Sequence, residues 1–239
     1  MLSRAALLIA EAFDDDLDVS FHAGRIERLG DEARRRIAGT SDDPEGNKVR
    51  AGRLLRLLFD EVGFAGNRAD YYDPRNSFLH HVLDRRLGIP ISLAVILIEV
   101  ARHAGVRADG IGFPGHFLVR LGEPVGESSS SPMAADLPIV IDPFGGRLLE
   151  AASLRALNAQ VTGSDGDPDP RLLLPCTSRR LLTRMLGNLR GIYRARGDQR
   201  SLLLVLERLA VLTPGDEDVT SALAALAGPP PPRPAPLKN

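Results

Sequence analysis

A serine stands just after the proline that opens a long apolar run, and a serine hydroxyl is one of the groups that can attack a carbonyl carbon. The run "RRLGIPISLAVILIEVARHAG" covers residues 85–105 and contains Pro90, Ser92 and Gly105. Pro90 suits the first position of a helix and Gly105 its end, so Ser92 is expected in the first helical turn. A hydroxyl there either acts as a nucleophile activated by a histidine or satisfies backbone N–H groups of the turn.

The histidine and the carboxylate that such a serine would need are predicted on two short strands. The segments "GHFLVRL" and "LPIVID" read as strands, with His116 at the start of the first and Asp142 at the end of the second. If these strands are antiparallel neighbours with Arg120 opposite Pro138, then His116 lies opposite Asp142. A carboxylate beside an imidazole fixes its tautomer and stabilises its charged form. The alternatives are a strand-edge role for His116 and a turn-forming role for Asp142, which precedes Pro143.

The apolar run predicts a helix in the centre of the core. It is too short to span a bilayer, which needs about 20 apolar residues. Apolar side chains lie on every side of the helix between Ile91 and Val100, and such a helix is normally enclosed by other elements. Glu99 cannot stay charged in a core without a partner, so we expect it to pair with Arg85 or Arg86.

Helical patterns precede this segment, and strand patterns follow it. Apolar residues recur at helical spacing in the segments 3–13, 19–38, 44–62 and 76–86. Between the two predicted strands, the Ser-rich segment 122–136 is typical of a hairpin loop. A further helix is expected at about 151–160. These patterns predict an α+β domain in which a buried central helix packs on a small antiparallel sheet.

The C-terminal part has the spacing of one tetratricopeptide unit, two antiparallel helices with a glycine between them and a proline at the end. The matching positions are Leu186, Leu189, Tyr193, Gly197, Leu202, Leu206, Leu209 and Pro214. Three repeats are usually needed for independent stability, so this hairpin is expected to dock on the main domain. The predicted organisation is a main domain at 1–162, a linker at 163–177, tetratricopeptide-like helices at 178–227 and a Pro-rich disordered tail at 228–239.

Three segments resemble those of a known family. They are "YDPRNSFLHHVLDRRLGIPISLAVILIEVARHAG", "GFPGHFLVRL" and "IDPFGG", which in this order are similar to the SirB-type proteins. That family has a transglutaminase-core-like domain and often ends in tetratricopeptide repeats. The order nucleophile, histidine, aspartate also resembles the transglutaminase-like and papain-like hydrolases. The resemblance implies a transglutaminase/papain-like core, with a cysteine at the start of the buried helix and the histidine and aspartate on adjacent strands.

That cysteine is absent here, which changes the expected chemistry. Cys176 lies in the segment before the repeat helices, away from the start of the buried helix. The resemblance places Ser92 at or near the nucleophile position, His116 at the base and Asp142 at the orienting acid of a degenerate triad. A thiol is ionised far more easily than a serine hydroxyl, which would need an aligned base and an oxyanion hole.

The resemblance further implies a cleft around these positions. Six residues are expected to line it: Asn76, Arg85, Arg86, Pro114, Gly115 and Phe144. Structural roles are the alternative for several of them. Asn76 can cap a helix, the arginines can pair with Asp73 or Asp84, and the glycine can serve a tight turn.

The bulk composition disfavours several classes of partner. The 239 residues carry 30 Lys and Arg against 31 Asp and Glu, so no global positive field attracts nucleic acid or an anionic membrane. We find no zinc-ligand spacing, phosphate-binding loop or dinucleotide motif, and we expect neither a metal nor a cofactor. A single cysteine and the lack of a secretory signal pattern favour a cytoplasmic protein.

Positive charge is nevertheless concentrated in the C-terminal helical segment, at Arg179, Arg180, Arg184, Arg190, Arg194, Arg196 and Arg200. Such a cluster is either a solvated face or a site for an acidic protein or peptide. We expect a non-catalytic binding or regulatory protein with a protein or peptide partner, using the degenerate cleft and the repeat hairpin. One alternative is a serine-dependent hydrolase or acyl transferase that uses Ser92, His116 and Asp142. The other is an adaptor that docks through its tetratricopeptide-like region.

Overall fold

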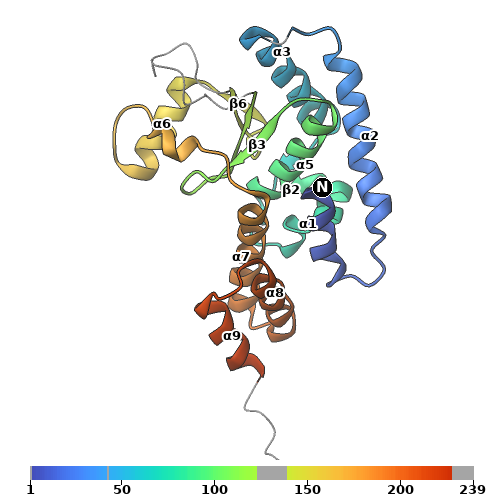
Figure 1. The fold of residues 1–239 in the computed structure, drawn as a ribbon, viewed down its shortest axis with the longest axis vertical. Helices are drawn as coiled ribbons and strands as arrows, with labels where there is room; N and C mark the ends of the chain where they lie inside the picture. The colour runs from blue at the N-terminus through green and yellow to red at the C-terminus, as the bar shows by residue number, and fades with distance from the viewer. Residues whose placement is uncertain (1, 42, 123–138, 228–239) are drawn as a thin grey trace, which may run out of the picture.

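The computed structural model describes residues 2–41, 43–122 and 139–227. The Pro-rich tail and most of the Ser-rich loop predicted at 122–136 lie outside these ranges. In Figure 1 the N-terminal helices form one side of the molecule and the sheet lies on the other side of the central helix α5. Helices α7, α8 and α9 extend away from this body as a separate lobe.

The N-terminal part is mostly helical, as the sequence predicts, but it also contains two short strands that were not predicted and that pair in parallel. Up to the start of α5, the described residues form α1 (Leu2–Glu11), α2 (Val19–Ile37), α3 (Pro44–Leu55), the π-helical turn η1 (Arg56–Glu61), the strand β1 (Ala65–Gly66), the 3₁₀ turn η2 (Pro74–Asn76), α4 (Leu79–Arg85) and the strand β2 (Leu87–Gly88). Asp18 and Asp43 cap α2 and α3 through their side chains, which accept hydrogen bonds from backbone N–H groups. Two predicted helices differ in extent, because the segment 44–62 changes to π-helical geometry at Arg56 and the segment 76–86 becomes α-helical only at Leu79.

Helix α5 (Pro90–His103) lies at the centre of the core, as its apolar run predicts. The helix packs against α2 and α1 on one side and against the sheet on the other. Glu99 is the acidic residue within this helix, and its Oε2 accepts hydrogen bonds from the backbone N–H and the hydroxyl of Ser3, at 3.1 and 2.7 Å. The expected pairing with Arg85 or Arg86 is therefore wrong: Arg85 lies against Asp73, and Arg86 ends α4 in the left-handed conformation.

After α5 come β3 (Ala108–Ile111), β4 (Leu118–Leu121), β5 (Ile139–Asp142), β6 (Arg147–Leu149) and α6 (Ala151–Thr162). The strands form one antiparallel sheet in the order β3-β4-β5-β6. The two predicted strands, β4 and β5, are antiparallel neighbours as expected, whereas β3 and β6 were not predicted. The expected register is wrong by two residues, because Arg120 pairs with Val140 and not with Pro138. A shift of two keeps each side chain on its predicted face, since strand side chains alternate with a period of two.

The two faces of the sheet pack against different helices. Val119 and Ile141 belong to the main core around α5, whereas Leu118 and Val140 belong to a second apolar cluster with Leu154 of α6. The sheet therefore separates α5 from α6. This arrangement decides which of the predicted site residues can meet.

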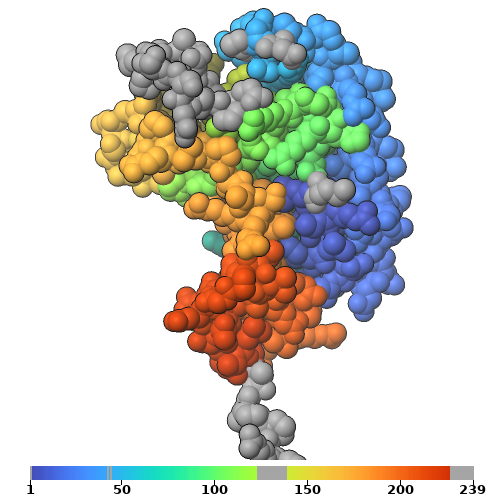
Figure 2. Space-filling view, viewed as in Figure 1, coloured from blue at the N-terminus to red at the C-terminus, as the bar shows by residue number. Residues whose placement is uncertain are grey.

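The C-terminal part consists of the 3₁₀ turn η3 (Pro170–Leu173), α7 (Ser178–Arg196), α8 (Gln199–Leu212) and α9 (Glu217–Ala227). Helices α7 and α8 form the predicted hairpin, with Gly197 between them at φ 67°. Helix α7 contacts α1 and α5, and the ring of Tyr193 stacks on that of Phe13 at 5.9 Å between centroids. Figure 2 shows the resulting lobe at the end of the molecule opposite α3. No helix within the described residues is long and apolar enough to cross a membrane.

Candidate binding cavity at His116 and Asp142

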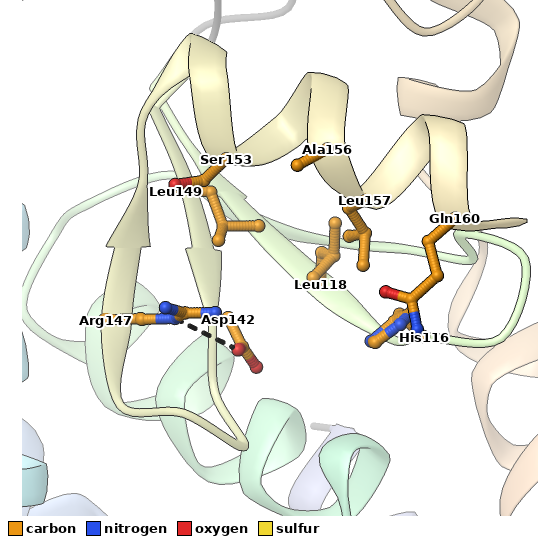
Figure 3. Close-up of a pocket in the computed structure, with 9 residues that line it drawn as sticks. All are labelled: His116, Leu118, Asp142, Arg147, Leu149, Ser153, Ala156, Leu157 and Gln160. Carbon is orange, nitrogen blue, oxygen red and sulfur yellow. Dashed lines mark ion pairs between the residues drawn. The ribbon is translucent and has the colours of Figure 1, made fainter. Parts of the chain in front are cut away.

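A cavity of about 310 Å³ lies between the outer face of the sheet and α6. Its wall combines apolar and polar side chains from β4, β5, β6, α6 and the turn before β4. The lining residues are His116, Leu118, Asp142, Arg147, Leu149, Ser153, Ala156, Leu157 and Gln160. Figure 3 shows them around one space. Of the predicted site residues, His116 and Asp142 therefore meet at a single cavity.

Asp142 organises the turn between β5 and β6. Its Oδ1 accepts hydrogen bonds from the backbone N–H groups of Phe144 and Gly145, each at 3.0 Å. Its Oδ2 lies 3.6 Å from Nε of Arg147. Asp142 thus has the turn-forming role that its position before a proline indicates. Its carboxylate also borders the cavity, where it places an acceptor beside the guanidinium of Arg147.

His116 enters the cavity from the turn before β4. Its backbone N–H donates to the carbonyl oxygen of Phe113 at 3.0 Å, and its own carbonyl oxygen accepts from Arg184 of α7 at 3.3 Å. Figure 3 shows the imidazole beside the side chain of Gln160 and apart from the Asp142 carboxylate. Within the part of the chain that the structure describes, no hydrogen bond or ion pair joins His116 to Asp142. The expectation that the two residues lie directly opposite is wrong because of the two-residue shift in register.

Ser92 lies away from this cavity, on α5 and behind the sheet. Its side chain is fully buried, with 0 % exposure. Its Oγ accepts a hydrogen bond from the N–H of Ile89 at 3.1 Å and lies 2.6 Å from the carbonyl oxygen of Asn76, to which the hydroxyl can donate. These bonds fix the start of α5 and the preceding turn. The structure therefore does not bring Ser92 to His116, since the sheet lies between α5 and the cavity.

Asn76 forms a buried polar network beside Ser92. Its Nδ2 donates to the carbonyl oxygens of Asp70 and Tyr71 at 2.7 and 3.2 Å, and its Oδ1 accepts from Nδ2 of Asn67 at 3.0 Å. All of its side chain is enclosed. Asn76 therefore shapes the loop that carries Tyr71 and does not line the cavity.

Asp73 is the acidic centre of the same segment. Its Oδ2 lies 3.1 Å from Arg85 and 2.9 Å from Arg75. Burial disfavours the charged carboxylate, but the hydrogen bonds from Arg75 and the nearby charge of Arg85 outweigh it and hold the pKa of Asp73 below its usual value. Arg85 thus has the predicted alternative role, an ion pair with Asp73.

The other residues predicted to line the cleft are not part of the cavity wall. Arg86 ends α4, and Gly115, at φ 69°, forms with Pro114 the turn that precedes His116. Phe144 points toward β1, where a Cβ on Gly66 would lie 2.4 Å from its ring, and the guanidinium of Arg68 lies 5.0 Å from the ring centroid. The family resemblance therefore did not predict where these residues lie relative to the cavity.

Sequence reasoning missed the part of the cavity that α6 provides. Ser153, Ala156, Leu157 and Gln160 line it at the spacing i, i+3, i+4 and i+7, which is one face of a helix. The mixture of polar and apolar types on this face hides it from a search for an apolar stripe. The short strand β6, which adds Arg147 and Leu149, left no pattern of its own.

The described residues contain no group of three or more His, Cys, Asp or Glu side chains placed to hold a metal ion. Cys176 is half-buried between the N-terminal end of α7 and β3, where a Cβ on Gly110 would lie 3.3 Å from its Sγ. Burial raises the pKa of this thiol. It does not belong to the cavity wall.

A buried helix packed on a small antiparallel sheet is the arrangement expected of a transglutaminase-like core. The family model described as the transglutaminase-like superfamily matches residues 22–187. A UPF0162 protein of Xylella fastidiosa is 41 % identical over 197 residues, which are 80 % of this chain and 64 % of that protein. A UPF0162 protein of Pseudomonas aeruginosa is 32 % identical over 213 residues, 89 % of this chain and 72 % of that protein. The chain therefore belongs to the transglutaminase-like superfamily and, within it, to the UPF0162 family.

A second kind of relative is eukaryotic. F-box only protein 21 of Homo sapiens is 35 % identical over 155 residues, which are 64 % of this chain and 23 % of that protein. The chain spans 64 % of the length of the Xylella relative that it matches. No solved structure matches the chain.

Proposed function

We propose that this protein works by non-covalent binding, and that the cavity between the sheet and α6 holds a short, uncharged polar segment of a partner protein. The observation that carries the proposal is the separation of the predicted triad: His116 and Asp142 border a cavity, whereas the hydroxyl of Ser92 is enclosed on the other side of the sheet. A histidine and an aspartate that the hydroxyl of Ser92 does not reach can still donate and accept hydrogen bonds.

The chemistry of the wall favours a neutral ligand. The carboxylate of Asp142 only accepts hydrogen bonds and the guanidinium of Arg147 only donates them, and their opposite charges lie 3.6 Å apart. His116, Ser153 and Gln160 can do either. An amide group presents one acceptor and one or two donors, so backbone amides or a carboxamide side chain match this wall without an unpaired charge. The apolar side chains of the wall, Leu118, Leu149 and Leu157, would cover an adjoining apolar side chain of the same segment.

The test uses small peptide probes and two matched tryptophan variants. Ala156 borders the cavity, and Ala152 is exposed on the same helix without bordering it. The probes are N-acetyl-Leu-Gln-amide, N-acetyl-Leu-Glu-amide and N-acetyl-Leu-Lys-amide, titrated into the ¹⁵N-labelled chain and followed by NMR. We expect saturable shifts at Leu118, Leu157 and Gln160, largest with the glutamine probe. Ala156→Trp should abolish these shifts, and Ala152→Trp should keep them.

Two outcomes would overturn the proposal. One is the absence of saturable shifts with all three probes in a folded protein. The other is equal binding by the unmodified chain and by Ala156→Trp, because a filled cavity cannot hold a ligand. Tighter binding of the glutamate or lysine probe would contradict the assignment of a neutral ligand.

A further inference from the structure

A second hollow lies between α7 and the loop that carries Tyr71 and Tyr72. It has a volume of about 560 Å³ and is lined by Tyr71, Tyr72, Ile89, Gly187, Asn188, Gly191, Ile192, Ala195 and Arg196. We call it the α7 groove. Most of its wall is apolar, and its volume falls within the range of about 300–1,000 Å³ that ligand pockets span. It shares no residue with the cavity at His116 and Asp142.

One wall of the groove is the exposed loop before η2. Tyr72 is 71 % exposed and Tyr71 is 42 % exposed, which is unusual for large aromatic side chains. Hydrogen bonds from two side chains hold the loop in place. Asn76 donates to the carbonyl oxygens of Asp70 and Tyr71. Arg196 donates to the carbonyl oxygen of Tyr72 at 3.1 Å. The aromatic wall is therefore preorganised.

The other wall is α7, in which all charged side chains are positive. The helix sequence SRRLLTRMLGNLRGIYRAR contains six arginines and no aspartate or glutamate, although the whole chain has nearly balanced charge. Arg184 lies three residues before Gly187 and Arg180 seven residues before it, so both project from the helix face that forms the groove. Arg196 lines the other end of the groove.

These arginines have no carboxylate partner among the described residues. Asp73 is engaged by Arg75 and Arg85, and Asp198 caps α8 by accepting from the N–H of Ser201. Arg184 is partly occupied, with its guanidinium 5.2 Å from the ring centroid of Phe117. An apolar surface flanked by guanidinium groups of one sign is complementary to apolar side chains flanked by carboxylates.

We infer that the α7 groove binds an acidic amphipathic segment of a partner protein, with bulky apolar side chains against Tyr71, Tyr72 and Ile192 and with carboxylates facing Arg180 and Arg196. This inference deepens the proposed binding function, because it assigns a ligand class to the repeat hairpin, but it concerns a surface separate from the cavity. A helical segment fits the wall well, since Gly187, Gly191 and Ala195 lie one turn apart and let a backbone approach closely.

The experiment selects ligands without assuming their sequence. A phage-displayed library of random 16-residue peptides is screened against the full chain, and the recovered peptides are synthesised and titrated by fluorescence anisotropy. We expect peptides in which Asp and Glu alternate with Leu, Phe, Tyr or Trp at helical spacing. Their affinity should fall steeply as salt is raised, because carboxylate–guanidinium pairs at a groove edge are screened.

Matched variants locate the binding. A Cβ on Gly191 or on Gly52 of α3 would meet no atom within 4 Å, so both sites accept a larger residue without a clash at Cβ. Gly191→Trp should weaken the selected peptides by roughly tenfold or more, as expected for a filled hot spot. Gly52→Trp should leave binding unchanged. The double variant Arg180→Gln, Arg196→Gln should weaken binding and flatten its salt dependence, whereas Arg4→Gln, Arg28→Gln on the exposed surface of α1 and α2 should do neither.

Three results would overturn the inference: recovery of no binding peptides, recovery of peptides without acidic enrichment, or peptides that bind Gly191→Trp as well as the unmodified chain. Vesicles containing phosphatidylserine serve as a rival probe. If the chain binds vesicles but no peptide, and the double variant Arg180→Gln, Arg196→Gln loses vesicle binding, the surface is assigned to an anionic membrane instead. Ala156→Trp keeps the two proposals distinguishable, because it should block the cavity probes and leave the peptides of the α7 groove bound.

Discussion

The hydroxyl oxygen of Ser92 lies 2.6 Å from the carbonyl oxygen of Asn76, and this contact joins the first turn of α5 to the segment that ends at η2. The same oxygen accepts the N–H of Ile89, so both hydrogen-bonding functions of the serine are used inside the protein. The residue predicted at or near the nucleophile position thus links two structural elements.

Replacing Ser92 by alanine should lower the free energy of unfolding by about 1–3 kcal/mol, because the carbonyl oxygen of Asn76 and the N–H of Ile89 would be left buried without this partner. Urea denaturation followed by circular dichroism measures the change. Ser178→Ala, at an exposed position at the start of α7, should change stability by less than about 0.5 kcal/mol. In the unmodified chain a fluorophosphonate probe should not label Ser92. Labelling of Ser92 that depends on His116 would restore the serine-hydrolase alternative.

The two arginines that contact Asp73 should contribute unequally to stability. The side chain of Arg75 is 59 % exposed, whereas that of Arg85 is 24 % exposed. Arg85→Met should destabilise the protein by about 2–3 kcal/mol, because it leaves a buried carboxylate with weaker compensation. Arg75→Met should cost about 1 kcal/mol or less, as is usual for an exposed ion pair. Equal losses in the two variants would contradict this ranking.

A buried histidine predicts a loss of stability in mild acid. His80 is 4 % exposed, and its Nε2 lies 3.5 Å from Oδ2 of Asp14, but neither ring nitrogen has a hydrogen-bond partner within the described residues. Burial lowers its pKa from 6.5 to about 4, reinforced by His81 and His22 and opposed by Asp14 and Asp84. Since the unfolded chain then binds the proton first, stability is fully present above pH 6.5 and declines as the pH falls toward about 4, by up to about 3 kcal/mol.

Comparison with His80→Phe isolates this contribution. The variant keeps a ring beside Phe78 and His22 but carries no titratable group. Denaturation curves between pH 7 and pH 4 should show a smaller loss of stability in the variant than in the unmodified chain. Parallel curves would exclude His80 as a source of the acid sensitivity.

Two substitutions of Asp142 should separate its role in the turn from its role in the cavity. Asparagine keeps an oxygen that can accept from the N–H groups of Phe144 and Gly145, whereas alanine removes it. Asp142→Ala should cost about 1–2 kcal/mol of stability, and Asp142→Asn much less. Both variants remove the charge beside Arg147, so both should weaken binding of the glutamine probe in the NMR titration. Full binding by Asp142→Asn would show that the carboxylate is not part of the ligand contact.

The helices and the central element follow from the sequence because their signals are local. Pro90 and the apolar run define α5, and Asp18 begins α2 through a single side chain. The alternation also predicted β4 and β5 as strands, and their assumed antiparallel pairing is confirmed, but the assumed register is wrong, since register depends on the turn and on neighbouring strands. The strand β3 was missed because Ala108–Ile111 contains Asp109 and Gly110, which are uncommon in strands.

The candidate site could be predicted only in part. His116 and Asp142 share a face of the sheet and meet at one cavity. Strand side chains alternate with a period of two, so a register shift of two residues keeps both on that face. The prediction for Ser92 failed for a geometric reason. Its hydroxyl bonds to the carbonyl oxygen of Asn76, and a helix side chain changes direction by about 100° for each residue along the chain. No sequence pattern indicated that α6 would supply the opposite wall.

The sheet that divides α5 from α6 also dictates how chemistry could be introduced into this scaffold. A thiol installed at Ser92 would be enclosed on the far side of the sheet, so it could not reach the imidazole of His116. The helix that faces His116 is α6, where Gln160 stands beside the imidazole in Figure 3. A designer who wants a working nucleophile should graft it onto that helix, which makes the outer layer of the molecule, and not its core, the place where new reactivity can evolve.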